Sequence, residues 1–340
     1  VVPRQMVSKD IVINRSASEG YSGAVVIPRL QGSFNCVRMI KGESAFVLAD
    51  SRSLKIISAT DKKVVADSIL PIGSQIINID VISAKTDYAD ILVTYVALNK
   101  VYTDVYHFDG IKMMPVITKE PYFTKMVMLQ GKDKKLFVQD QGDESNRYFG
   151  PVYEAKWNGK QIVRGRVFML PDNVSLYRFN QFTDKAGAVM TVTYDDNDYV
   201  AVYDSNFEKI WKSNDKFGGS ELSYSIRDLS YINKTGKEYR TYFMNQKIEV
   251  TPAQSVLIGS NDGSFVLGDS RSYKKGLVYN FVWNGSALEE SWRTKETQSY
   301  MPDFEYADDT KQLYQLQLVS RENPFKADTG VSSLIVKKVE

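Results

Sequence analysis

The segment Tyr153-Glu154-Ala155-Lys156-Trp157-Asn158-Gly159 is a short aromatic strand that ends in a tight turn, and the same pattern returns along the chain. Similar segments are Val105-Tyr106-His107-Phe108-Asp109-Gly110, Val202-Tyr203-Asp204-Ser205-Asn206 and Tyr279-Asn280-Phe281-Val282-Trp283-Asn284-Gly285. Asn-Gly and Asp-Gly tolerate the positive φ angles of the tight turns that fit the twist of antiparallel strands. Each segment therefore predicts a strand followed by a hairpin turn.

The spacing of these turns indicates a repeat. Counted from an earlier turn at Asp61-Lys62, they fall near residues 61, 110, 159, 206 and 285, so the period is about 48 residues. Apolar and polar residues alternate over short runs almost everywhere, which is typical of half-buried strands. A repeat of this size that holds four short strands is a β-propeller blade.

The blades are expected at residues 34–70, 75–118, 122–170, 174–214, 242–295 and 299–340. The chain is thus predicted to be all-β, with residues 10–340 forming one six-bladed propeller after a lead-in at 1–9; seven blades is the alternative. The long interval before the last turn leaves an insertion at about 217–247.

The last predicted blade reaches only its third strand before the chain ends. Residues 10–17 resemble the fourth strands at 209–213 and 289–294. We therefore expect residues 10–17 to pair with 332–339 and close the ring, which removes an open sheet edge.

Composition excludes several classes of protein. The 340 residues are 43% apolar and 25% charged, with 43 Lys plus Arg against 41 Asp plus Glu, which excludes disorder and makes nucleic-acid binding unlikely. No apolar run is long enough for a membrane-spanning helix. The chain begins Val1-Val2-Pro3, so we expect that a signal peptide or a first domain has been removed, and that the protein is periplasmic or extracellular, with association with the outer membrane as an option.

Several motifs resemble those of bacterial envelope proteins with FG-GAP or VCBS repeats, whose propeller is similar to that of the integrin α-subunit head. The motifs are the strands that end in Trp-Asn-Gly, the pair Ile210-Trp211-Lys212-Ser213 and Phe217-Gly218-Gly219-Ser220-Glu221, and Ser291-Trp292-Arg293-Thr294. The resemblance implies a propeller of the cell envelope that binds another protein.

In such families the turn between the first two strands commonly carries an acidic calcium loop. The matching turns at 80–90, 183–187 and 307–311 carry lysines and too few acids for a cation that prefers six to eight oxygen ligands. We therefore expect no cofactor and no calcium. The densest acidic cluster, Asp195, Asp196 and Asp198, is interpreted as a solvated hairpin loop and is the weak candidate for a metal site.

Residues for catalysis are scarce. His107 is the single histidine and lies in a predicted strand, so histidine metal clusters and most nucleophile relays are excluded unless it takes part. Cys36 is the single cysteine and is interpreted as a small core residue. We predict that the chain is not an enzyme.

The insertion is the segment that the repeat explains least, and a long excursion from a compact fold is often functional. Its candidate partner-binding residues, which pair large aromatic rings with cations, are Tyr224, Arg227, Tyr231, Arg240 and Tyr242. The chain is predicted to be a non-catalytic interaction module that binds another envelope or surface protein and no nucleic acid. Two alternatives stay open, namely a glycan-binding or glycan-cleaving propeller that uses acids and aromatic residues of its central channel, and a structural subunit of a surface filament or envelope complex.

Overall fold

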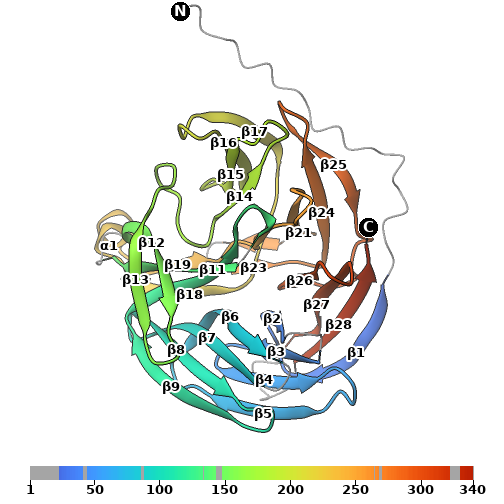
Figure 1. Cartoon of the computed structure of the whole chain (residues 1–340). Helices are drawn as coiled ribbons and strands as arrows, with labels where there is room; N and C mark the ends of the chain where they lie inside the picture. Colours follow the sequence, from blue (N-terminus) through green and yellow to red (C-terminus); the bar gives the residue numbers. More distant parts are fainter. Residues whose placement is uncertain are drawn as a thin grey trace, which may run out of the picture.

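The computed structural model shows a ring of six four-stranded antiparallel sheets arranged around a central axis (Figure 1). The structure describes residues 23–40, 44–85, 88–132, 134–142, 148–263, 265–267, 270–321 and 330–339. The prediction of an all-β, six-bladed propeller is confirmed. Within the described ranges no helix is both long and apolar enough to cross a membrane.

Each blade begins at the channel and ends at the outer rim. Blade one contains β2 (Cys36–Met39), β3 (Ala45–Ala49), β4 (Ser53–Ser58) and β5 (Val64–Ile69). Blade two contains β6 (Gln75–Lys85), β7 (Tyr88–Ala97), β8 (Lys100–Phe108) and β9 (Met113–Glu120). Blade three contains β10 (Tyr122–Met128), β11 (Lys134–Gln141), β12 (Tyr148–Trp157) and β13 (Ile162–Phe168). A short 3₁₀ turn, Leu129–Gly131, joins β10 to β11.

The other half of the ring follows the same plan. Blade four contains β14 (Phe179–Thr183), β15 (Val189–Tyr194), β16 (Tyr199–Tyr203) and β17 (Lys209–Lys216). Blade five contains β20 (Ile248–Val250), β21 (Val256–Asp262), β24 (Lys275–Trp283) and β25 (Leu288–Arg293). Blade six contains β26 (Phe304–Ala307), β27 (Gln312–Ser320), β28 (Val331–Lys338) and β1 (Ala24–Gln31). Blade five starts at 248 rather than 242, because Tyr242 belongs to the insertion.

The ring closes through an N-terminal strand, but the strand is β1 and not residues 10–17, which lie outside the described residues. β1 pairs antiparallel with β28, with Ala24 opposite Val336 and Gln31 opposite Val331. Because β28 pairs with β27 along its other edge, it has no edge left for residues 10–17. Ile27 and Leu30 of β1 also pack into the core between blades six and one, so burial of apolar surface holds this strand in place.

The hairpin turns take the conformation that their sequences predict. Gly159 and Gly285 have φ angles of +87° and +103°, and the side chain of Asn158 accepts hydrogen bonds from the backbone N–H groups of Lys160 and Gln161. Asparagine and glycine thus supply the turn geometry directly.

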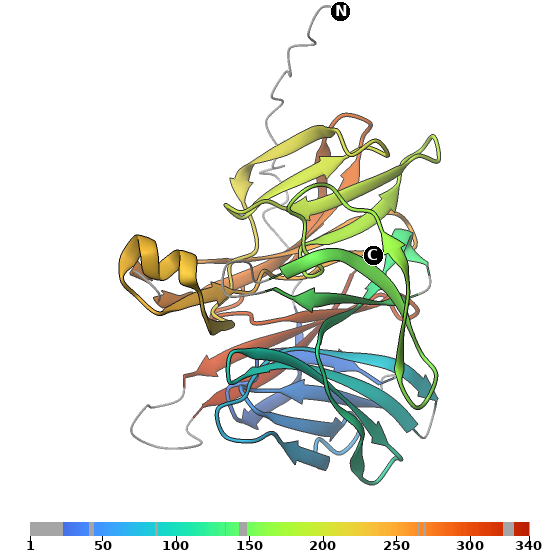
Figure 2. The same ribbon diagram turned by 90° about the vertical axis from the view of Figure 1, so that its left-hand side faces the viewer.

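The insertion folds into a separate hairpin. It contains β18 (Ser223–Arg227), the helix α1 (Leu229–Thr235) and β19 (Tyr239–Phe243), and Asp228 caps the helix by accepting a hydrogen bond from the Tyr231 backbone. The hairpin projects from the face that points away from the viewer in Figure 1, as the side view in Figure 2 shows. We call this the insertion face. A second, smaller excursion, β22 (Phe265–Leu267) with β23 (Ser270–Ser272), leaves blade five and was not expected from the sequence.

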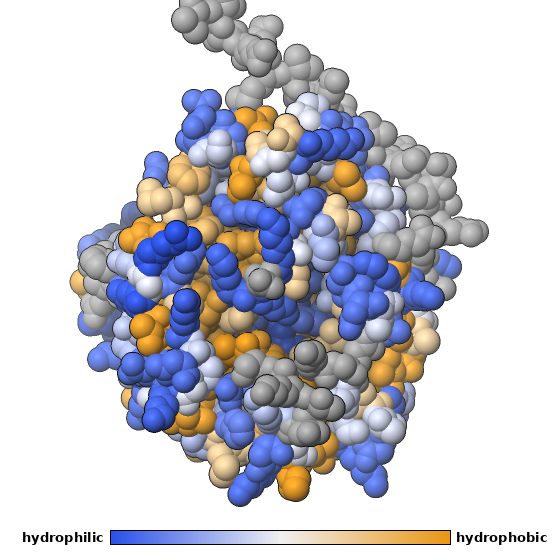
Figure 3. Space-filling model, in the orientation of Figure 1, coloured by the Kyte–Doolittle hydropathy of each residue, from blue (hydrophilic) through white to orange (hydrophobic). Residues whose placement is uncertain are grey.

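The opposite face, toward the viewer in Figure 1, is covered mostly by hydrophilic side chains (Figure 3). Hydrophobic side chains appear there only in patches between the hydrophilic ones. The apolar residues lie mainly between the blades, as in the cluster that packs blade four against blade five.

Candidate functional site

A pocket of about 530 Å³ lies between blades four and five. We call it the blade 4–5 pocket. Blade four contributes the β15–β16 turn and the end of β17 with the link that follows it, and blade five contributes the end of β21, β23, β24 and the segment after β25. The lining residues are Asp198, Lys216, Phe217, Gly218, Gly219, Ser260, Asn261, Asp262, Arg271, Tyr273, Lys275, Gly276, Leu277, Tyr279 and Glu296. The pocket thus combines charged, aromatic and backbone groups from segments that are far apart in the sequence.

Two consecutive glycines form part of the pocket wall. Gly218 and Gly219 both have φ angles of +79°, a conformation that side chains disfavour. The Gly218 N–H donates to the carbonyl of Gly259 at 2.9 Å, and its carbonyl accepts from the Asn261 N–H at 2.8 Å. A Cβ at Gly219 would lie 3.0 Å from the ring of Tyr273. The glycine pair therefore lets the link from blade four lie directly against β21.

Asn261 fixes this link with its side-chain amide. Its Nδ2 donates to the carbonyls of Gly219 at 2.8 Å and Met301 at 2.9 Å, while its Oδ1 accepts from the Met301 N–H at 3.0 Å. One buried amide thus joins the start of the insertion to the segment that enters blade six.

Aromatic rings are held rigidly around the pocket. Tyr273 stacks on the buried Tyr300, with 6.0 Å between ring centroids, and Phe217 meets Tyr279 edge to face at 5.4 Å. Burial raises the pKa of Tyr273 and of Tyr279, so both phenols are neutral at physiological pH. The rings offer flat apolar surfaces with hydroxyl groups at their edges.

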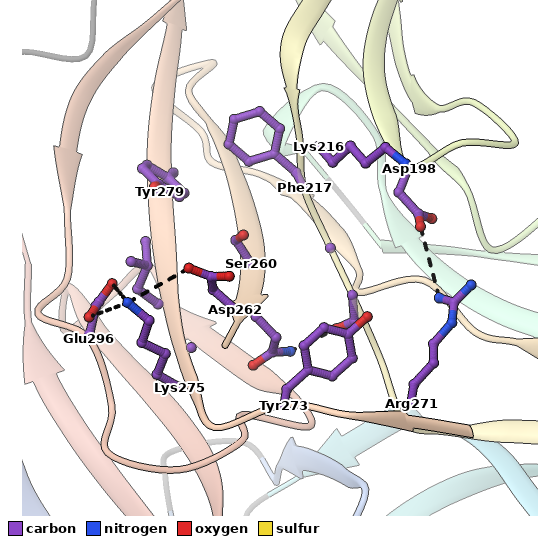
Figure 4. Close-up of a pocket in the computed structure, with 15 residues that line it drawn as sticks. Asp198, Lys216, Phe217, Ser260, Asp262, Arg271, Tyr273, Lys275, Tyr279 and Glu296 are labelled. Atoms are coloured by element: carbon purple, nitrogen blue, oxygen red, sulfur yellow. Dashed lines mark hydrogen bonds and ion pairs between the residues drawn. The ribbon is translucent and has the colours of Figure 1, made fainter. Parts of the chain in front are cut away.

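Charged residues lie in two groups on opposite sides of the pocket (Figure 4). On one side Arg271 faces Asp198 at 3.9 Å, and on the other Lys275 contacts Glu296 at 2.9 Å and Asp262 at 3.7 Å. The hydrogen bond that Lys275 donates to Glu296 raises the pKa of Lys275. The side chain of Arg271 is 27% exposed and that of Glu296 is 47% exposed, so a ligand can reach these groups.

The insertion borders this pocket through its ends rather than through its hairpin tip. Phe217, Gly218 and Gly219 are its first residues, and near its end the Asn245 amide donates to Asp198 at 2.8 Å. The guanidinium of Arg271 also lies 4.1 Å from the ring centroid of Phe243. The segment singled out by its length therefore contributes to the pocket.

Two of the residues expected to bind a partner are buried instead. Tyr224 and Tyr242 are 3% and 8% exposed, stack on each other at 5.7 Å, and pack into the core near Phe123. The Tyr242 hydroxyl donates to Asp228 at 2.8 Å. The expectation that these two tyrosines contact a partner is corrected, because alternate residues of β18 and β19 face the propeller.

The other three candidate residues are more exposed than these two tyrosines, and Arg240 lies at the hairpin end of the face that carries Tyr242. Arg227 contacts Glu238 at 3.0 Å, and Arg240 contacts Asp228 at 3.5 Å. The Arg240 guanidinium lies 5.7 Å from the ring centroid of Tyr231. Binding by Arg227, Tyr231 and Arg240 stays a prediction.

The acidic cluster at 195–198 is divided among different partners. Asp195 contacts Lys212 at 2.6 Å, Asp196 pairs with Arg178, and Asp198 accepts the hydrogen bond from Asn245. Within the described parts of the chain, no group of three or more His, Cys, Asp or Glu side chains has the geometry to hold a metal ion. These carboxylates stabilise the turn between β15 and β16.

His107 contacts a carboxylate that also binds a tryptophan, and Cys36 is buried. The His107 Nδ1 lies 2.7 Å from Asp90, whose other oxygen accepts a hydrogen bond from the Trp157 indole at 2.8 Å. Cys36 is 4% exposed, and burial raises its pKa to about 12, so it is a neutral thiol at the inner end of blade one.

The central channel holds a network of buried charges that the sequence analysis did not find. Arg38 contacts Asp80 at 3.2 Å and Asp303 at 2.5 Å, and Lys247 contacts Glu305 at 2.6 Å and Glu249 at 2.9 Å. We call these six residues the channel network. Interactions with Lys247, Lys134 and Arg38 hold the pKa of Glu305 at about 2 despite its burial.

The carboxylates of the channel network are the residues that a glycan-cleaving channel, one of the alternatives from the sequence, would use. That chemistry needs a proton-donating acid and a second carboxylate that is free to act as base or nucleophile. Here Asp303 lies against both Arg38 and Lys247, and Glu305 against Lys247 and Lys134. Asp303 and Glu305 are therefore paired with cations, whereas burial raises the pKa of Glu249, which contacts Lys247.

Comparisons with known proteins identify no family. No family model and no curated protein sequence matches this chain. Among solved structures, Raptor from Chaetomium thermophilum is similar with a TM-score of 0.48 and 12% identity, over 95% of this chain and 29% of that chain. A chain of the mitotic checkpoint complex is similar with a TM-score of 0.48 and 9% identity, over 100% of this chain and 98% of that one. This chain therefore spans less than a third of the Raptor chain.

Proposed function

We propose that this chain is a non-catalytic interaction module of a bacterial cell-envelope or secreted protein of the FG-GAP/VCBS type, and that it binds a partner protein at the blade 4–5 pocket. The observation that carries the proposal is the pocket itself, where two exposed charge groups flank rigid aromatic rings on a strand scaffold. Such a combination of charge and anchored aromatic surface is typical of protein recognition sites. A propeller is compatible with this role, because its rigid blades position the connecting segments.

The test uses the full chain with the charges of Lys216 and Arg271 reversed. The variants Lys216→Glu and Arg271→Glu change the pocket wall and leave the blade cores intact. Lys160→Glu, in the exposed turn of blade three, is the matched control. Proteins cross-linked to each form in its own cells are quantified by mass spectrometry.

We expect one envelope protein to be cross-linked recurrently to the wild type. The amount recovered with the pocket variants should be at least tenfold lower, and the amount recovered with the control should equal that of the wild type. Thermal unfolding of each variant shows whether it is folded. Equal recovery from a folded pocket variant contradicts the proposal.

Glycan binding at the same pocket is the second candidate. Aromatic faces next to several charged and amide groups in one concave site are also suited to a sugar. A glycan array probed with the same variants separates the two functions, since only glycan binding gives array signals that disappear with Arg271→Glu.

A further inference from the structure

Among the described cations of the channel, Lys125 on the innermost strand β10 is the one that the channel network does not neutralise. Its side chain is 7% exposed, and its ammonium has no hydrogen-bond partner among the described residues. An unpaired buried charge is unfavourable, so it either loses its proton or takes up a counter-ion.

Cavities adjoin Lys125 toward both ends of the channel. One of about 50 Å³ is bordered by residues 244–247 of the insertion, and one of about 80 Å³ is bordered by residues 249–252 and by Asp308. Lys125, Arg38 and Lys247 line both cavities and therefore form the waist between them.

In the cavity on the insertion side, Arg38 and Lys247 are paired within the channel network and Lys125 is not. Arg38, Lys125 and Lys247 line it together with one carboxylate, Asp303. That carboxylate already accepts hydrogen bonds from Arg38 at 2.5 Å and from the Val37 N–H at 3.0 Å. The remaining polar lining residues are Asn35, Asn78, Ser220, Asn245, Gln246 and Tyr177, which are neutral.

We propose that the insertion-side end of the channel binds one carboxylate group, which forms an ion pair with Lys125. The cavity of about 50 Å³ has room for a group of this size and not for a large ligand. The carboxylate is either a small free carboxylate or the Asp or Glu side chain of a peptide. This inference does not depend on ligand binding at the blade 4–5 pocket.

The titration of Lys125 agrees with this assignment. Burial, with a contribution from Arg38 and Lys247, lowers its pKa to about 8, against the opposing effect of Asp80 and Glu249. Asp80 is itself engaged by Arg38, by the Asn78 amide and by the Met126 N–H. A bound carboxylate supplies the partner that these residues do not.

The experiment measures the midpoint of thermal unfolding of the full chain in sodium acetate and in sodium chloride of the same ionic strength. Wild type is compared with Lys125→Met, which keeps the length of the side chain without its charge, and with Lys160→Met as control. We expect acetate to raise the midpoint of wild type and of the control by several degrees, and that of Lys125→Met by less than one degree. Equal shifts in all three proteins, or equal effects of acetate and chloride, overturn the proposal.

A second measurement keeps the test valid if Lys125→Met does not fold. Calorimetric titration of the wild type with acetate, and with the peptides acetyl-Ala-Glu-Ala-amide and acetyl-Ala-Gln-Ala-amide, measures binding directly. Binding of acetate alone assigns a free carboxylate, and binding of the Glu peptide but not the Gln peptide assigns a peptide side chain. Absence of binding by acetate and by the Glu peptide overturns the proposal.

Discussion

The channel network and the blade 4–5 pocket both bring acids and bases together from distant parts of the chain, but they differ in burial. In the channel, the side chains of Arg38, Asp80 and Glu305 are each less than 10% exposed and contact opposite charges directly. In the pocket, Arg271 and Asp198 are 3.9 Å apart and about a quarter exposed. Buried charges must be satisfied for the protein to fold, whereas exposed charges remain available to a ligand. The paired charges of the channel network therefore contribute to stability, whereas those of the blade 4–5 pocket remain accessible.

The largest expected effect comes from Arg38. Arg38→Met leaves Asp80 buried without its cation and Asp303 with Lys247 alone, which should lower the free energy of unfolding by about 3–5 kcal/mol. Arg271→Met in the pocket should cost less than about 1 kcal/mol. Urea unfolding measures both. Equal losses would show that the two regions do not differ as described.

The pH dependence of stability should distinguish Lys125 from the paired cations of the channel. The pKa of Lys125 falls from an ordinary 10.5 to about 8 on folding, so between these values the unfolded chain binds more protons than the folded one. Stability then increases as pH rises, and wild type should gain about 2 kcal/mol between pH 8 and pH 10 relative to Lys125→Met. Urea unfolding across this range, in buffer without carboxylate ions, measures the difference. A parallel pH dependence in the two proteins would contradict it.

Gly219 tests how tightly the pocket wall is built. Gly219→Ala combines a positive φ angle with a Cβ only 3.0 Å from the Tyr273 ring, whereas Gly159→Ala has a similar φ angle and no atom within 4 Å. We expect the Gly219 variant to lose about 1 kcal/mol more than the control. Thermal unfolding compares the two. Similar losses would mean that Tyr273 moves aside without cost.

The smallest effect is expected at Lys275, on the other side of the pocket. Its ion pairs with Glu296 and Asp262 are solvent-exposed, so Lys275→Met should change stability by about 0.5 kcal/mol or less. Raising the salt concentration should remove even this difference, because exposed pairs are screened. A loss that persists in high salt would show that the pocket charges are also structural.

Local sequence patterns were sufficient to predict the fold class. The turn-forming residues and the period of about 48 residues depend on local backbone geometry, which is why the six blades and the position of the insertion could be predicted. The closing strand was assigned to residues 10–17 instead of β1, because several alternating segments near the N-terminus satisfy the same local pattern. Burial alternates along β18 and β19, and this alternation places Tyr224 and Tyr242 toward the core.

The pairing of charged residues, by contrast, depends on how the blades pack and could not be predicted from the sequence. Arg38, Lys125 and Lys247 alternate with apolar residues in the same way as solvent-facing positions do, so nothing local distinguishes a channel residue from a surface residue. The pocket residues span from Asp198 to Glu296 and converge only because blades four and five are neighbours and the link at Gly218 lies against β21. Burial and pairing depend on contacts between blades, and the physical character of each site is set by those contacts.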